Sequence, residues 1–238
     1  MHRALLGLIA ILAFGVAWAT DDKPKPKTKL EALQPFNEFV GPWQAAGEPE
    51  GSEQEKRRGL WKESVNWSWK FKGDDAWITV AFGKGKYFKN GEIHYLPERD
   101  KYELTLETKD GKRLVFEGAL VKEGRSFVAD RVDEDKKESQ RITFDLVGDI
   151  RFVYRYEHKP EGRTTFIKDY RVGATKEGES LASSKDNRPK CVVSGGLGTI
   201  AVSYKGQMYF VCCTGCRDAF NENPEKYIKE FEANKNKK

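Results

Sequence analysis

Cysteine is absent from residues 1–190, and the four cysteines of the chain, Cys191, Cys212, Cys213 and Cys216, lie close together near the C-terminus. Disulfides that hold a fold together are normally spread through it. The larger part of this 238-residue chain must therefore be stabilised by a hydrophobic core instead of by disulfides. Its 12% aromatic residues supply enough apolar surface to build such a core. The same composition argues against disorder of the whole chain.

Sequence signatures of common enzymes are also missing. The chain has no Gly-x-Ser-x-Gly, no His-Glu-x-x-His, no phosphate-binding loop and no dinucleotide fingerprint. Its acidic stretch DRVDEDKKES is typical of a solvated turn rather than of a catalytic pair of carboxylates. The formal net charge of +5 comes without a basic stripe, which argues against a nucleic-acid partner. We therefore expect a binding protein and not an enzyme.

Long hydrophobic runs are confined to the N-terminus. His2 and Arg3 precede an apolar run from Ala4 to Val16, and Ala17-Trp18-Ala19 offers the small-x-small pattern that signal peptidase cleaves. The run is short for a membrane span, and the charged stretch DDKPKPKTK follows it at once. We predict a cleaved signal peptide over 1–19, a periplasmic or secreted protein without stable membrane insertion, and a disordered leader over 20–29. A retained membrane anchor is the alternative.

Alternating apolar and polar residues dominate the segment 30–172, which we predict to be one β-barrel domain. Val65, Trp67, Trp69 and Phe71 alternate with polar residues, and the same period of two recurs in about nine or ten segments separated by turn signals. Residues 30–40 have helical spacing instead and predict a short helix with Pro35 near a bend. Consecutive hairpins with one apolar face are most simply closed as an up-and-down barrel, and a two-sheet sandwich is the alternative.

The string LQPFNEFVGPWQAAGEPEG, a short helix that leads into Gly41-Pro42-Trp43, resembles the opening of lipocalin-like (calycin) barrels, including the nitrobindin-type group. This resemblance implies a barrel that can enclose a small apolar ligand, or haem held by a histidine. Only His94 and His158 follow the predicted signal peptide, and both are expected to be surface or strand-end residues. The aromatic stripe of Trp67, Trp69, Phe71 and Trp77 is expected to form the barrel core.

A linker is predicted over 173–190, where the sequence is rich in Gly, Ser and charge. After it, residues 191–238 read as a compact module. The runs 199–204 and 207–211 flank Lys205-Gly206 and predict a hairpin, and the stretch after Cys216 predicts a helix, with Pro224 at the start of a second helical segment. The hairpin brings Cys212 close to the loop of Cys191.

This module resembles the YHS domain and its relative the TRASH domain, which are small treble-clef-like metal-binding units. The matching text is Cys191, the hairpin SYKGQMYFVCCTGC and the tail AFNENPEKYI. The resemblance places Cys191, Cys212 and Cys216 at the family's ligand positions, although the Tyr-His-Ser triplet is absent and the module contains no histidine. The fourth ligand stays open between Cys213, Asp218, water and a donor from another molecule.

Metal sensing, trafficking or resistance is the function that the resemblance implies, with Cu(I) or Zn(II) as the metal. A thiolate-only ligand set is soft, which suits these ions and slightly favours Cu(I). A structural disulfide and a thiol-disulfide redox role are the alternatives for the cysteines. At the level of the whole chain, we predict an exported soft-metal-binding protein on a mainly β scaffold. The alternative is a barrel-centred binder of haem or an apolar molecule, with a purely structural cysteine module.

Overall fold

The computed structural model describes residues 27–178 and 189–235. The predicted signal peptide, most of the predicted leader and the greater part of the predicted linker lie outside the described residues. None of the helices in the described part of the chain is long and apolar enough to cross a membrane.

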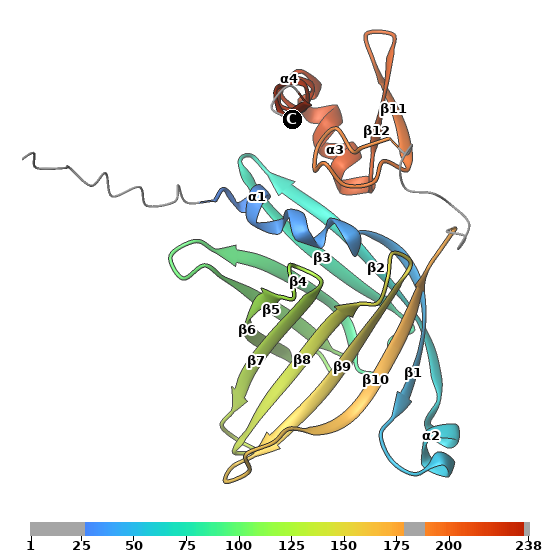
Figure 1. The fold of residues 1–238 in the computed structure, drawn as a ribbon, viewed down its shortest axis with the longest axis vertical. Helices are drawn as coiled ribbons and strands as arrows, with labels where there is room; N and C mark the ends of the chain where they lie inside the picture. The colour runs from blue at the N-terminus through green and yellow to red at the C-terminus, as the bar shows by residue number, and fades with distance from the viewer. Residues whose placement is uncertain (1–26, 179–188, 236–238) are drawn as a thin grey trace, which may run out of the picture.

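A closed antiparallel barrel of ten strands forms the larger part of the fold (Figure 1). Each strand pairs with its neighbour in sequence, and β1 closes the barrel by pairing with both β2 and β10. The predicted up-and-down barrel is confirmed, and the sandwich alternative is wrong. The strands are β1 (Gly41–Pro49), β2 (Trp61–Lys72), β3 (Asp75–Gly83), β4 (Phe88–Leu96), β5 (Lys101–Thr108), β6 (Arg113–Val121), β7 (Ser126–Asp133), β8 (Glu138–Leu146), β9 (Arg151–Pro160) and β10 (Ile167–Lys176).

The period of two in the sequence determines which side chains fill the barrel. In β2, Val65, Trp67 and Trp69 are fully buried, because alternate residues of a strand share one face. The Trp67 ring packs against those of Phe144 and Phe152 from the opposite wall, with ring centroids 5.2 and 6.2 Å apart. The prediction is therefore confirmed for Trp67 and Trp69 and wrong for Trp77, which is only partly buried and stacks on His94 outside the barrel, while Phe71 is only partly buried.

A short helical segment covers the upper end of the barrel. The helix α1 (Lys29–Leu33) begins with a capping box between Thr28 and Glu31, and a 3₁₀ helix, η1 (Gln34–Glu38), follows it. The helix predicted over 30–40, with a bend near Pro35, is therefore present as two segments. Pro35 lies in the first turn of η1, since a proline ring has no N–H to continue the α-helical hydrogen bonds.

The segment inserts two rings into the barrel. Phe36 and Phe39 are fully buried, and Phe39 lies 4.9 Å from Trp67 between ring centroids. The barrel is thus filled by aromatic packing at this end.

The lower end of the barrel carries α2 (Glu53–Gly59), which begins at a second capping box formed by Ser52 and Glu55.

The predicted domain boundary at Val172 falls too early, because β10 remains paired with β1 as far as Lys176.

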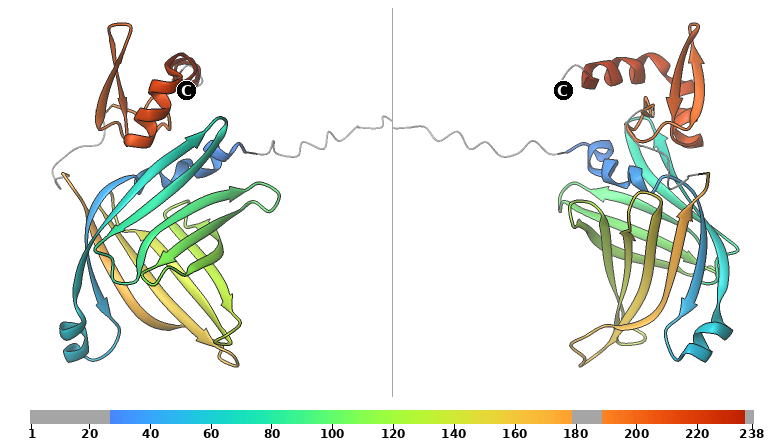
Figure 2. Two further views of the ribbon diagram at one scale, coloured as in Figure 1. Left: turned by 180° about the vertical axis from the view of Figure 1, so that it is seen from behind. Right: turned by 45° about the vertical axis from the view of Figure 1, so that its right-hand side comes forward.

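The C-terminal module consists of a hairpin and two helices. The hairpin is β11 (Ile200–Tyr204) with β12 (Gln207–Val211), and α3 (Thr214–Glu222) and α4 (Pro224–Lys235) follow it. The predicted hairpin is confirmed, and Pro224 starts α4 as expected. Both views of Figure 2 place the module beside the upper end of the barrel, at the opposite end from α2.

Candidate metal centre

Three parts of the module bring its cysteines together. Cys191 lies in the loop before the hairpin, Cys212 follows the end of β12, and Cys216 lies in the first turn of α3. Backbone hydrogen bonds fix the loop against the hairpin: Val192 N–H donates to the Phe210 carbonyl at 2.9 Å. The hairpin therefore delivers Cys212 to Cys191, as the spacing predicts.

The loop itself is a tight turn around Cys191. Its N–H donates to the Gly196 carbonyl at 2.7 Å, and the Gly195 N–H donates back to the Cys191 carbonyl at 2.9 Å. Gly195 has a φ of +76°, a conformation that strongly favours glycine. The turn aims the Cys191 sulfur inward, where it accepts a hydrogen bond from the Ser194 N–H at 3.4 Å.

The Sγ atoms of Cys191, Cys212 and Cys216 all lie within 4.8 Å of one another, and all three residues are buried. The sulfurs of Cys212 and Cys216 are 3.4 Å apart, well beyond the S–S bond length of about 2.05 Å, and all four cysteines are free. Three converging sulfurs without a bond between them are the arrangement of a metal site. The donor set fits a soft ion such as Cu(I) or Zn(II).

The four thiols share their protons unequally. Hydrogen bonds from Cys212 and Cys216 lower the pKa of Cys191, to which the Ser194 N–H also donates. The same neighbours lower the pKa of Cys213, whereas burial raises the pKa of Cys216. Hydrogen bonding to Cys191 and Cys213 raises the pKa of Cys212. The hydrogen bonds and burial therefore favour the thiolate form of Cys191 and Cys213 and the thiol form of Cys212 and Cys216, and a bound cation would displace the remaining protons of its ligands.

Neither protein candidate for a fourth ligand belongs to the converging set. The Cys213 sulfur lies 3.9 Å from that of Cys212 but is not within 4.8 Å of all three ligand sulfurs, because Cys213 is the N-cap residue of α3. Asp218 is exposed and pairs with Arg217 at 3.3 Å. The described residues thus bring together the three cysteines that the resemblance placed at ligand positions, and they leave these two outside.

The module docks on the projecting hairpin of β2 and β3. Asn37 of η1 links the two parts: its Oδ1 accepts a hydrogen bond from Trp69 Nε1 at 2.9 Å, and its Nδ2 donates to the Ser194 carbonyl at 3.0 Å. Lys226 of α4 pairs with Asp74 at 3.0 Å. Asn37 therefore ties the Cys191 loop to the barrel.

Gly215 lets α3 approach β2 closely. A Cβ at this position would lie 1.7 Å from the Trp69 carbonyl oxygen, a backbone atom that cannot turn aside. We expect Gly215→Ala to destabilise the docked module by about 1–3 kcal/mol, although alanine normally favours a helix over glycine by about 1 kcal/mol. Thermal unfolding combined with limited proteolysis between the two parts would measure this.

The matched control is Gly173→Ala in β10, where a Cβ would meet no atom within 4 Å. We expect this variant to unfold like the wild type. Equal effects of the two substitutions would contradict the docking described above.

The two histidines lie on different faces of the barrel. His94 alternates with the buried Ile93 and Tyr95, so it faces outward, where it stacks on Trp77 at 5.6 Å between ring centroids. His158 follows the inward positions of β9 and lines a pocket at the lower end of the barrel. The expectation of a surface or strand-end position therefore fits His94 and is incomplete for His158.

The fold and the site together define a class of protein: an up-and-down β-barrel that carries a small three-thiol module on one end. The C-terminal module can be assigned more specifically than the barrel. Its residues 199–230 match the YHS domain family. This confirms the resemblance predicted for the C-terminal part, and a YHS domain suggests metal binding.

Two solved structures resemble the larger part of the chain at low similarity. Rv2717c from M. tuberculosis is 13% identical, with 61% of this chain and 97% of that chain covered and a TM-score of 0.41. EF1p2_mFAP2b bound to DFHBI is 9% identical, with 61% and 99% covered and a TM-score of 0.25. No curated protein matches the chain.

Sequence reasoning missed the polar residues that support the thiols. Ser194 donates its backbone N–H to Cys191, and its hydroxyl lies 3.3 Å from the Cys212 sulfur. The Ser-Gly-Gly run after Cys191 was the available signal for this turn. Asn37 had no signal, because its two partners come from segments 32 and 157 residues away.

Proposed function

We propose that the protein is an exported soft-metal-binding protein in which Cys191, Cys212 and Cys216 hold one Cu(I) or Zn(II) ion. The observation that carries this proposal is the convergence of three buried, unbonded sulfurs in a segment that matches the YHS domain. Buried cysteines without a disulfide are free to give up their protons to a bound cation, which then neutralises the thiolate charge. The site would serve copper or zinc trafficking, sensing or resistance.

Cu(I) is the metal that the geometry favours. Structural Zn(II) sites are almost always four-coordinate, and catalytic ones keep three protein ligands with nitrogen or oxygen donors among them. Here the described residues bring together three sulfurs, with Cys213 outside the set. A soft, thiolate-only set of three suits Cu(I) without a further protein ligand.

Export is the second part of the proposal, and its support is the N-terminal sequence. The basic start, the apolar run and the small-x-small site are the parts of a cleavable signal. In an oxidising compartment a bound metal would protect the thiols from pairing, because a coordinated thiolate is less available for oxidation.

The competing proposal is a barrel-centred binder of haem or an apolar molecule. Much of the barrel interior is packed with rings, where Phe36 and Phe127 meet at 5.3 Å and Phe144 and Tyr154 at 5.5 Å between centroids. The remaining space at the lower end is lined by polar and charged groups as well as rings. Charged groups in this lining make the space a poor site for an apolar ligand. The three converging thiols, in contrast, are good ligands for a soft metal, so we favour metal binding.

Metal analysis of the protein purified anaerobically under reducing conditions tests the proposal. We expect one Cu(I) or one Zn(II) ion per chain after loading, with no free thiol among Cys191, Cys212 and Cys216. Reduced protein that binds neither ion would refute it. A matched sample oxidised before loading should bind no metal, since disulfides cannot act as thiolate ligands.

A further inference from the structure

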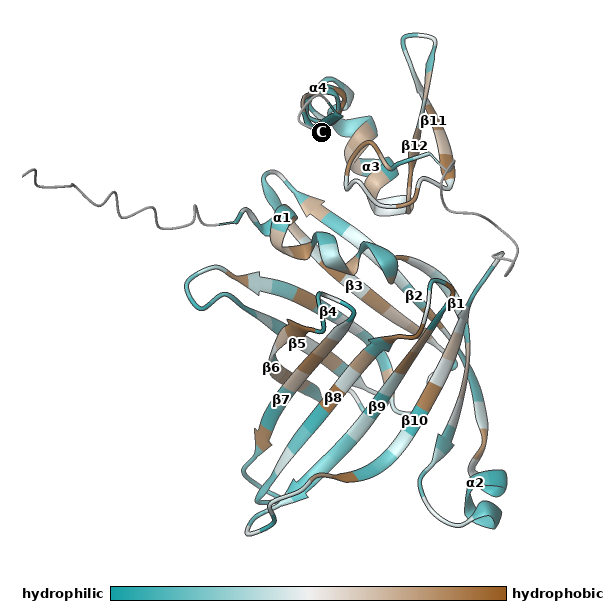
Figure 3. Ribbon diagram, in the orientation of Figure 1, coloured by the Kyte–Doolittle hydropathy of each residue, from teal (hydrophilic) through white to brown (hydrophobic). Residues whose placement is uncertain are grey.

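The inward face of the barrel changes character along its axis. Near the module it is apolar, with Phe127, Phe144 and Phe152 fully buried. Toward the opposite end the same inward positions of β7, β8 and β9 carry polar and charged residues, namely Arg131, Asp133, Glu138, Gln140 and His158. Figure 3 shows the hydrophilic colour at the lower ends of β8 and β9. Charged side chains facing the interior are costly to bury, and such costs are commonly met at functional sites.

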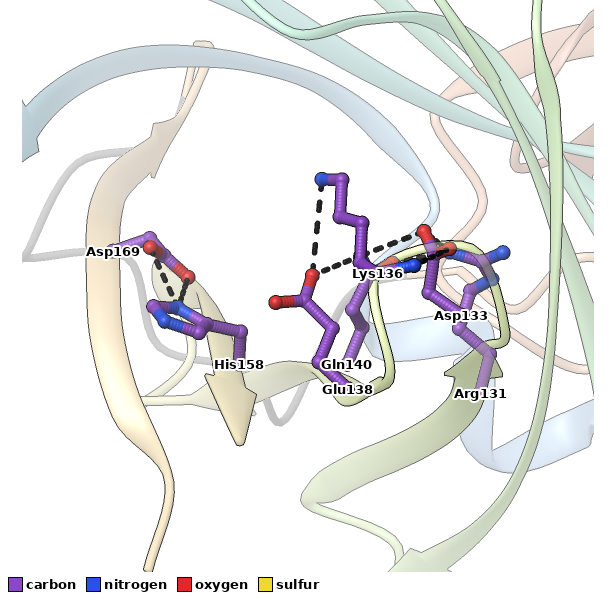
Figure 4. Close-up of polar contacts among 7 residues, drawn as sticks. All are labelled: Arg131, Asp133, Lys136, Glu138, Gln140, His158 and Asp169. Carbon is purple, nitrogen blue, oxygen red and sulfur yellow. Dashed lines mark hydrogen bonds and ion pairs between the residues drawn. The ribbon is translucent and has the colours of Figure 1, made fainter. Parts of the chain in front are cut away.

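Most of these charges are already paired with one another. Arg131 pairs with Asp133 at 3.1 Å, and Lys136 with Glu138 at 3.7 Å. Gln140, which is 2% exposed, donates to both carboxylates. Figure 4 shows this network on one side of the site and His158 on the other.

A β-bulge in β10 completes the site. Lys168 pairs with Glu157 and Tyr170 with Tyr156, so Asp169 is the extra residue between them. Bulges of this kind re-aim a side chain. Here the Asp169 carboxylate meets His158, with its two oxygens 2.8 and 2.9 Å from Nδ1 (Figure 4).

The Asp169 contact assigns a proton to His158 Nδ1, because the carboxylate can only accept. Among the described residues, Nε2 of the same ring has no hydrogen-bond partner. The hydroxyl of Tyr170, which lines the same pocket, is buried and also lacks a partner within the described part of the chain. The buried Tyr170 hydroxyl calls for a partner that is a water or a ligand, and the part-exposed Nε2 of His158 is available to accept a hydrogen bond from a ligand in the pocket.

The pocket around His158 has a volume of about 660 Å³, within the range of small-molecule sites. Its apolar wall consists of the rings of Tyr87, Phe88, Tyr156 and Tyr170. Tyr170 stacks with both Tyr87 and Tyr156, at 4.1 and 5.5 Å between ring centroids and with interplanar angles of 11° and 2°, so this wall is a stack of parallel rings that suits an aromatic partner.

We propose that this pocket binds a planar aromatic molecule with an acidic hydroxyl group, a phenol or an enol, whose oxygen shares one proton with His158 Nε2. The ring would lie against the tyrosine wall, and Asp169 would hold the imidazole in the required tautomer. A carboxylate ligand is disfavoured at Nε2, because an imidazole protonated at Nδ1 can only accept a hydrogen bond there and a carboxylate has no proton to donate. The site lies at the end of the barrel remote from the cysteines, so it is independent of the metal proposal.

Binding of 4-nitrophenol, measured by calorimetry and by its absorption spectrum, tests the proposal, with 4-nitroanisole as the matched ligand that lacks the hydroxyl proton. We expect the wild type to bind 4-nitrophenol at least about tenfold more tightly than 4-nitroanisole, the effect of one good hydrogen bond. His158→Gln should remove this preference. His94→Gln, which changes the outward-facing histidine, should bind both compounds like the wild type.

Equal binding of the two compounds by the wild type, or no binding of 4-nitrophenol at millimolar concentration, would overturn the proposal. So would an unchanged preference in a folded His158→Gln variant. If that variant does not fold, Asp169→Asn takes its place and should reduce the preference several-fold. A Soret band on titration with haem that His158→Gln abolishes would assign the pocket to haem and overturn the phenol proposal.

Discussion

Cys216→Ser is expected to lower the affinity for Cu(I) by more than about 100-fold. Loss of a group that only supports a ligand typically costs 10–100-fold in metal affinity, and loss of a ligand itself should cost more. Cys216 is fully buried in the first turn of α3 and lies 3.4 Å from Cys212 between sulfurs, so a serine in its place would leave two of the three converging sulfurs. A competition titration with a chromophoric Cu(I) chelator measures the change.

Cys213→Ser is the matched comparison, one helical turn from Cys216. The Cys213 sulfur lies outside the set of three, so we expect this variant to keep an affinity within a few-fold of the wild type. Circular dichroism should show both variants to be folded. Wild-type affinity in Cys216→Ser would contradict the site, and equal losses in the two variants would make Cys213 a fourth ligand.

Trp67→Ala is expected to reduce the free energy of unfolding by about 3–5 kcal/mol, the usual cost of deleting a large buried aromatic side chain. The Trp67 ring is fully buried and contacts rings from η1 and from two strands of the opposite wall, including Phe39 and Phe144. Its loss would leave a cavity that this closed barrel cannot collapse to fill. Chemical denaturation followed by circular dichroism would measure the effect.

Trp77→Ala serves as the control because Trp77 has the same side chain on the outward face of β3. Its ring is only partly buried and stacks on His94, so we expect a loss of about 1 kcal/mol. Similar losses for both tryptophans would mean that Trp67 does not occupy the core position described above.

The sequence predicts the barrel well because its period of two is a local signal that survives in the fold. Val65, Trp67 and Trp69 are buried in alternation as expected. The local signal of Pro35 likewise marks the place where the helical segment changes from α to 3₁₀. Local rules fail at the end of the barrel, where β10 continues past Val172 because β1 pairs with it.

An irregularity in the sequence of β10 marks the β-bulge, although the sequence alone did not predict the bulge. Lys168 interrupts the alternation between Phe166 and Tyr170, and the structure shows a bulge at that place. A bulge is a relation between two strands, so a single strand's pattern can mark an irregularity without revealing that Asp169 turns toward His158.

The cysteine site also has a part that the sequence predicts and a part that it does not. Spacing predicts that Cys191, Cys212 and Cys216 meet, since a hairpin and a helix start fix their separation in space. The role of Asn37 depends on docking between parts of the chain that are distant in sequence, and no local pattern encodes it.

X-ray absorption spectroscopy at the metal edge of the loaded, reduced protein tests the central claim most directly, because it counts the sulfur ligands. We expect a first shell of three sulfur atoms, at about 2.3 Å if the metal is Zn(II), and one fewer in Cys216→Ser. A shell of nitrogen and oxygen alone, or a sulfur count that Cys216→Ser leaves unchanged, would contradict the three-thiolate site.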